Sequence, residues 1–185
     1  MNKFKYAFIA LMAFSFASCG SDEKVKEAKV ATTTDQKVEL TNLINRLEGE
    51  MHRSMKIDNV IAGQALQAYS DFSKNYPNDS ITPDYLFKAG EIATAIQQYP
   101  QALAYYQLIT QKYPNYKLVQ ESLFLQAALL DNFLNDDAKA KVIYEQLIKA
   151  YPKSTYVNDA KAAINNLGKT DEQLIKEFQK KNGEK

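Results

Sequence analysis

Side chains that commonly carry catalysis or bind metals are rare in this chain. Its 185 residues include one cysteine, Cys19, and one histidine, His52. A single cysteine excludes an internal disulfide and a paired-cysteine zinc or redox site. A single histidine leaves almost no material for histidine metal sites, and the sequence patterns of phosphate-binding loops, serine hydrolases and zinc proteases do not occur. We therefore expect no enzyme activity and no metal site.

The residues before Cys19 predict one modification. Lys3 and Lys5 precede an apolar run from Tyr6 to Phe16, which is short for a membrane span but suits the hydrophobic part of a secretory signal. The segment Phe16-Ala17-Ser18-Cys19 resembles a bacterial lipobox. The resemblance implies a signal peptide over residues 1–18 and a covalent lipid, including palmitate-type acyl chains, on the Cys19 thiol, with no other cofactor. The alternative is an ordinary cleaved signal with an incidental cysteine.

Residues 19–34 are predicted to be the lipidated cysteine and a flexible linker, because they are polar and lack periodicity. Gly20 stands where an aspartate would resemble an inner-membrane retention signal. The expected location is therefore the outer membrane of a Gram-negative cell envelope. Ser21, Asp22 and Glu23 resemble the export signal of surface lipoproteins, but a plain solvated tether explains them equally well. The periplasmic and surface faces both stay open.

A repeat is visible in the rest of the chain, where Tyr-Pro recurs after 37 and then 38 residues, at Pro77, Pro114 and Pro152. Upstream of each pair stand an alanine, a tyrosine and an apolar residue at steps of four and three, which keeps them on one helix face. Proline ends each predicted helix. The aligned positions are Ala65, Tyr69 and Phe72; Ala102, Tyr106 and Ile109; and Ala140, Tyr144 and Leu147. We interpret the three tyrosines as repeat core rather than as platforms for stacking sugars.

This pattern resembles the second half of the tetratricopeptide repeat. The resemblance implies an all-α fold, an α-α superhelix of about four antiparallel helix pairs, over residues 35–182. The period is similar to that of repeats in bacterial envelope proteins such as the β-barrel-assembly lipoprotein and the Tol-Pal-associated cell-division coordinator. In the first half of the unit, Leu86 and Leu123 replace the family's tryptophan, while Gly90 and Ala127 take its small crossing position.

Capping residues predict the ends of eight helices. The predicted start signals include a threonine N-cap at Thr82 followed by a proline in the first turn. Gly168 is predicted to end a helix. The other start signals are Thr33 with Gln36, Asp58, Pro100, Asn135 or Asp136, and Thr170 with Gln173.

The resemblance also implies a binding groove, because the first helix of each tetratricopeptide pair lines the concave side of the array. The groove positions combine acids with two phenylalanines, which suits a basic or amphipathic peptide segment. The alternative is that Asp84 serves its own helix N-terminus and that both phenylalanines are core. The predicted groove residues are Asp84, Phe87, Glu91, Thr94, Glu121, Phe124, Ala128, Asp131 and Asn132.

The predicted function is a lipid-anchored envelope scaffold that binds a protein or peptide partner, for example in an outer-membrane assembly or cell-division complex. The net charge of +1 provides no basic surface for nucleic acid. The alternative is a surface accessory lipoprotein that holds a glycan or nutrient ligand for an uptake system.

Overall fold

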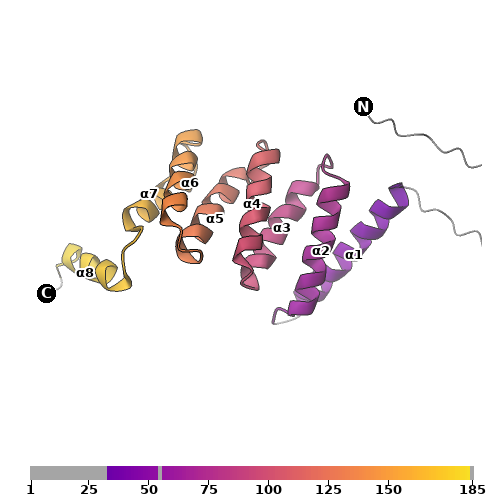
Figure 1. The fold of residues 1–185 in the computed structure, drawn as a ribbon, viewed down its shortest axis with the longest axis horizontal. Coiled ribbons are helices and arrows are strands. Elements are labelled where there is room, and N and C mark those ends of the chain that lie inside the picture. The colour runs from indigo at the N-terminus through magenta and orange to yellow at the C-terminus, as the bar shows by residue number, and fades with distance from the viewer. Residues whose placement is uncertain (1–32, 54–55, 184–185) are drawn as a thin grey trace, which may run out of the picture. The chain divides into compact units, whose positions relative to one another are not determined.

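The computed structural model describes residues 33–53 and 56–183. The predicted signal peptide, Cys19 and nearly all of the predicted linker lie outside the described residues. The described residues belong to one compact unit. The described part of this unit contains eight α-helices and no strand. The helices follow one another in chain order (Figure 1).

Each helix up to the seventh packs against its neighbour in the sequence, which confirms the predicted all-α, tetratricopeptide-like superhelix. Within the described ranges no helix has the length and apolar character needed to cross a membrane. The helices are α1 (Thr33–Arg53), α2 (Asn59–Asn75), α3 (Thr82–Ala95), α4 (Tyr99–Lys112), α5 (Val119–Asn132), α6 (Asp137–Ala150), α7 (Val157–Asn166) and α8 (Asp171–Lys181).

The repeated alanine, tyrosine and apolar positions form the core of the array, as predicted. All nine side chains lie on α2, α4 and α6, and none is more than 2% exposed. A glycine on α3 lets the Tyr106 ring of α4 approach the helix backbone closely. At Gly90 of α3 the approach is so close that an added Cβ would lie 2.6 Å from the ring of Tyr106. Ala127 holds the aligned position on α5 and is fully buried.

The same turn follows α2, α4 and α6. Tyr76, Tyr113 and Tyr151 end these helices with φ between −130° and −127°, and each donates its N–H to the carbonyl four residues earlier. The carbonyl of each tyrosine then accepts the N–H three residues later, at 2.9–3.1 Å. The proline after each tyrosine prevents the helix from continuing. The repeated Tyr-Pro pair therefore encodes one turn geometry three times.

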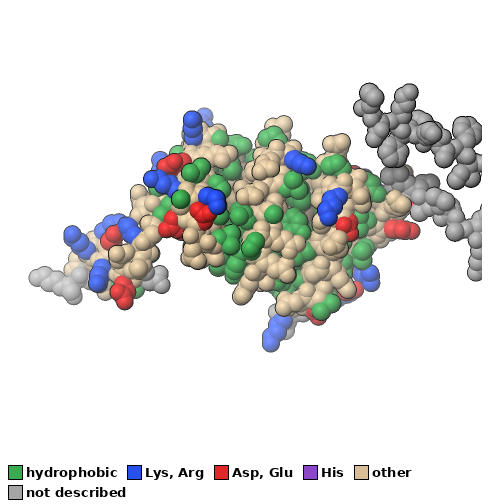
Figure 2. All heavy atoms as spheres, viewed as in Figure 1, with side chains coloured by type: hydrophobic (Ala, Val, Ile, Leu, Met, Phe, Trp, Pro, Cys, Tyr) green, Lys and Arg blue, Asp and Glu red, His purple; other side chains and the backbone are tan. Residues whose placement is uncertain are grey.

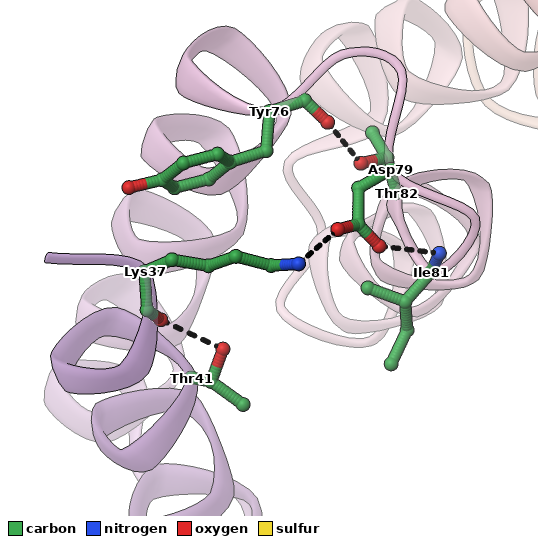
Figure 3. A network of polar contacts seen from close by, with 6 residues as sticks. All are labelled: Lys37, Thr41, Tyr76, Asp79, Ile81 and Thr82. Carbon is green, nitrogen blue, oxygen red and sulfur yellow. Dashed lines mark hydrogen bonds and ion pairs between the residues drawn. The ribbon is translucent and has the colours of Figure 1, made fainter. Parts of the chain in front are cut away.

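The predicted N-cap at Thr82 is wrong. Ile81 occupies the N-cap position of α3 without a side-chain hydrogen bond, and Thr82 is the first helical residue. Its side chain is fully buried, and a buried hydroxyl needs a partner. Figure 3 shows that partner, because the Thr82 hydroxyl donates to the carbonyl of Tyr76 at 2.6 Å. Thr82 therefore stabilises the turn after α2 rather than capping α3.

Several other predicted boundaries are confirmed. Asp58 caps α2 by accepting the N–H groups of Val60 and Ile61 at 2.8 and 3.2 Å. Asp136 caps α6, and Thr170 forms the predicted capping box at the start of α8. Pro83 and Pro100 lie in the first turns of α3 and α4, and Gly168 follows α7 with φ of 72°.

The last helix differs from the others. Among the side chains described on α8 none is buried, and Ile175 and Phe178 are 56% and 63% exposed. Charged side chains gather over α8 and the neighbouring end of the array, whereas the visible face of the middle helices carries few (Figure 2). The packed core therefore extends from α1 to α7.

Candidate functional site

The two phenylalanines predicted to anchor a partner are covered by tyrosines. Phe87 is 6% exposed, and its ring lies 5.6 Å from that of Tyr106 and 6.4 Å from that of Tyr116. Phe124 is half-buried; its ring stacks on Tyr156 at 5.2 Å and packs near Tyr144. Phe87 is therefore buried, and the part of both phenylalanines in partner binding stays a prediction. Phe87 belongs to the core, and Phe124 packs against it.

Three other predicted groove residues are engaged by their own surroundings. Thr94 donates its hydroxyl to the carbonyl of Gly90 at 2.8 Å, and the Asn132 amide donates to the carbonyl of Ala128 at 2.9 Å. Asp131 is half-buried, and its burial together with the charge of Asp137 raises its pKa. Their part in partner binding stays a prediction.

The solvent-facing side of α3 consists of four residues, each of which follows the one before it by four, three and then four positions. Four residues on α5, each 37 positions later in the sequence, have the same spacing. All eight side chains are partly or fully exposed. Most of the positions between them are buried, so this side is distinct from the core. We call these residues the A-helix face. They are Asp84, Lys88, Glu91 and Ala95 on α3, and Glu121, Leu125, Ala128 and Asn132 on α5. Lys88, Ala95 and Leu125 were not among the predicted groove residues.

A polar bridge joins α1 to this face. Lys88 Nζ lies 2.7 Å from Glu48 Oε1, and the Tyr69 hydroxyl donates to the same oxygen at 2.6 Å. Burial, followed by the hydrogen bond to Glu48, raises the pKa of Tyr69 far above its ordinary value, so this hydroxyl stays a donor. This bridge was not predictable from the sequence, because Tyr69 and Lys88 are 21 and 40 residues from Glu48 and no helical spacing rule links such positions.

Asp84 is held by the turn that follows α4. It accepts a hydrogen bond from the Tyr116 hydroxyl at 2.9 Å, and Lys117 Nζ lies 2.8 Å from the same carboxylate oxygen. Burial alone would raise the pKa of Asp84, but the hydrogen bonds from Lys117 and Tyr116 outweigh it and hold the pKa below its usual value. Asp84 therefore links consecutive helix pairs as well as lying in the first turn of α3.

A cavity of about 410 Å³ opens between α1 and α3. Four of its lining residues are apolar, and Tyr69, Glu48, Lys88 and Glu91 bring polar groups to it. We call it the α1–α3 pocket. Its lining consists of Glu48, Met51, His52, Ile57, Tyr69, Lys88, Glu91, Ile92 and Ala95. Of these, only Glu91 was among the predicted groove residues. In the described part of the chain, no group of three or more metal-ligating side chains is placed to hold an ion.

Two segments, residues 84–116 and 121–154, match the family model of the tetratricopeptide repeat. These two segments are identified as tetratricopeptide repeats. The first match runs from α3 through α4 and the second from α5 through α6. No curated protein sequence matches the chain. Tetratricopeptide repeats typically act as non-catalytic scaffolds that bind protein or peptide partners, and extended surfaces of stacked repeats provide the binding sites.

The tetratricopeptide matches place the A-helix face on the first helices of both matched repeats. The α1–α3 pocket lies at the edge of the first match, because α1 and α2 precede residue 84. The α1–α2 pair nevertheless carries the same buried alanine, tyrosine and aromatic positions on α2. The pocket therefore lies between α1 and α3, and Ile57, which precedes α2, and Tyr69 of α2 complete its lining.

Proposed function

We propose that this chain is a lipid-anchored scaffold of the Gram-negative outer membrane that binds a protein or peptide partner along the A-helix face. The observation that carries the proposal is the separation of this face from the core. The core tyrosines and the residues around them are buried, while charged side chains remain exposed on this face. Asp84 and Lys88 are paired with neighbouring side chains, whereas Glu91 forms no ion pair with the described residues and is available to a partner.

The charges on the face favour a basic or amphipathic segment. Asp84, Glu91 and Glu121 carry three carboxylates, whereas Lys88 is the one cation among its eight residues. Acidic surfaces steer basic partners and fix their register. The apolar positions Leu125 and Ala128 add a surface for a nonpolar side chain.

The lipid anchor is supported by the residues before Cys19 rather than by the described structure. The basic start, the apolar run and the small residues before the cysteine are the expected order for a lipoprotein signal. Replacing Cys19→Ser should move the protein from the membrane fraction to the soluble fraction and abolish labelling with radioactive palmitate. Retention in the membrane with unchanged labelling would refute the anchor.

Crosslinking in intact cells followed by mass spectrometry tests the scaffold role. The wild-type chain should yield a reproducible envelope protein, and Glu121→Lys on the A-helix face should strongly reduce its recovery. Glu172→Lys on α8 makes the same charge change on an exposed residue away from the face and should leave recovery unchanged. Equal loss with both variants would refute a role for this face. Stabilisation by soluble glycans without any crosslinked protein would favour the accessory-lipoprotein alternative.

A further inference from the structure

The α1–α3 pocket combines an apolar wall with a carboxylate-rich side. Met51, Ile57, Ile92 and Ala95 supply the wall, and the Ile57 side chain is 53% exposed although it is apolar. The volume of about 410 Å³ is within the range of pockets that hold small organic groups. A ligand that fits must therefore have both an apolar stem and a polar head.

Glu48 retains capacity to accept more hydrogen bonds. The contacts given by Tyr69 and Lys88 both end on Oε1. An ionised carboxylate has two oxygens and about four lone-pair sites. The bridge also fixes the orientation of Glu48, because donors from α2 and α3 hold the same oxygen. Its second oxygen is thus a positioned acceptor on a side chain that is 20% exposed.

Glu91 supplies the second carboxylate of the pocket. Among the described side chains, no cationic nitrogen lies within 4.0 Å of the Glu91 carboxylate oxygens. Partial burial, followed by the nearby charge of Glu121, raises the pKa of Glu91, while Lys88 opposes the shift. The pocket therefore carries two carboxylates against one ammonium group, with His52 also lining it, and its electrostatic balance favours an added cation.

Taken with the proposed function, on which this inference rests, these features identify the occupant. We propose that the α1–α3 pocket binds one arginine side chain of the partner segment. The aliphatic stem lies against Met51, Ile57 and Ile92, as arginine stems do on apolar surfaces. The guanidinium group binds between the carboxylates of Glu91 and Glu48. Arginine suits this site better than lysine because its planar fork donates in several directions at once.

Titration by NMR with a minimal probe tests the pocket. The probe is Nα-acetyl-arginine amide, and its neutral isostere Nα-acetyl-citrulline amide is the matched control. The arginine probe should shift the methyl signals of Met51, Ile57 and Ile92 saturably. The citrulline probe should bind at least about tenfold more weakly, because it lacks the charge that strengthens hydrogen bonds to the carboxylates. Equal binding of the two probes, or shifts confined to other helices, would overturn the proposal.

Variants test the carboxylates separately from the fold. Glu91→Gln should weaken arginine binding about tenfold while its far-UV circular dichroism stays unchanged. Glu172→Gln on α8 removes the same charge from an exposed residue and should leave binding unchanged. If Glu91→Gln binds arginine as tightly as wild type, the proposal is wrong.

The two proposals can fail independently. If Glu91→Gln leaves the crosslinked partner unchanged while Glu121→Lys removes it, the arginine pocket is refuted and the scaffold function stands. If wild-type cells yield no partner but the arginine probe still saturates the pocket, the scaffold function fails and the pocket stands.

Discussion

The contact between Gly90 and Tyr106 predicts that adding one methyl group will weaken the fold. Gly90 lies in the middle of α3, where alanine would ordinarily be favoured over glycine by about 1 kcal/mol. An added Cβ, however, would lie 2.6 Å from Cε1 and Cζ of Tyr106. Carbon atoms pack best at about 3.5–4.0 Å, so the overlap exceeds what small adjustments relieve.

The ring of Tyr106 has little room to move away. The residue is 1% exposed, and its ring also packs against Phe87 at 5.6 Å. Substitutions that add atoms to a well-packed core typically lower the free energy of unfolding by about 1–3 kcal/mol. Because the alanine preference offsets part of the strain, we expect Gly90→Ala to lower the free energy of unfolding by about 1–2 kcal/mol. For a domain of this size, that corresponds to a melting temperature lower by about 3–6 °C.

Gly63→Ala is the matched control. Gly63 also lies inside a helix, α2, but an added Cβ meets no atom within 4 Å. This variant should gain about 0.5–1 kcal/mol in free energy of unfolding, so the two substitutions should have opposite signs. Urea denaturation followed by circular dichroism measures both. Equal stabilisation by both variants would refute the close approach of Tyr106. Gly90→Ala should also cost less free energy of unfolding in a Tyr106→Leu background than in the wild-type chain.

Three further predictions concern polar groups. Thr82→Val removes the buried donor to the Tyr76 carbonyl and should cost about 1–2 kcal/mol in urea denaturation, whereas an unchanged midpoint would show that the bond is not needed. Hydrogen bonding to Lys37 lowers the pKa of Asp79 (Figure 3), so Asp79→Asn should destabilise slightly at pH 7. The difference between the thermal melts of the two chains should begin to shrink below about pH 4, where the unfolded carboxyl protonates, and should vanish only below the lowered pKa of the folded carboxyl. Burial is the main cause of the raised pKa of Glu91, so the charged form of this side chain opposes folding. Glu91→Gln should therefore raise the melting temperature at pH 7. This increase in melting temperature should disappear below about pH 4, where Glu91 is protonated in the wild-type chain. A Glu91→Gln chain that melts lower at pH 7 would contradict this reasoning.

The core was predictable because one local pattern encodes it three times. The steps from Ala102 to Tyr106 and from Tyr106 to Ile109 define a helix face without any knowledge of the neighbouring helices. The Tyr-Pro pair adds the turn, because proline restricts both itself and the residue before it. Local sequence therefore contains enough information to place these buried residues.

The exposed face was only partly predictable, because its limits depend on contacts between helices. Phe87 and Lys88 are three and four residues after Asp84, so helical periodicity alone allows either to share its side of α3. Packing against Tyr106 and the later turn residue Tyr116 decides the question by burying Phe87. Neither partner is adjacent to Phe87 in the sequence. Residues that become neighbours only through stacking of helix pairs escape a local analysis.

The two halves of the A-helix face have different chemistry on the same geometry. Lys88 and Glu91 on α3 align with Leu125 and Ala128 on α5, although the buried positions around them repeat. The buried residues, which repeat, are needed for folding, whereas the exposed residues, which differ between the repeats, can determine which partner binds. The charged half lies beside the α1–α3 pocket, and the apolar half lies one repeat further along the chain. A matching partner segment would therefore present its basic side chain toward α1 and a nonpolar side chain toward α5. Reversing that order in a bound peptide should weaken binding even though its composition is unchanged.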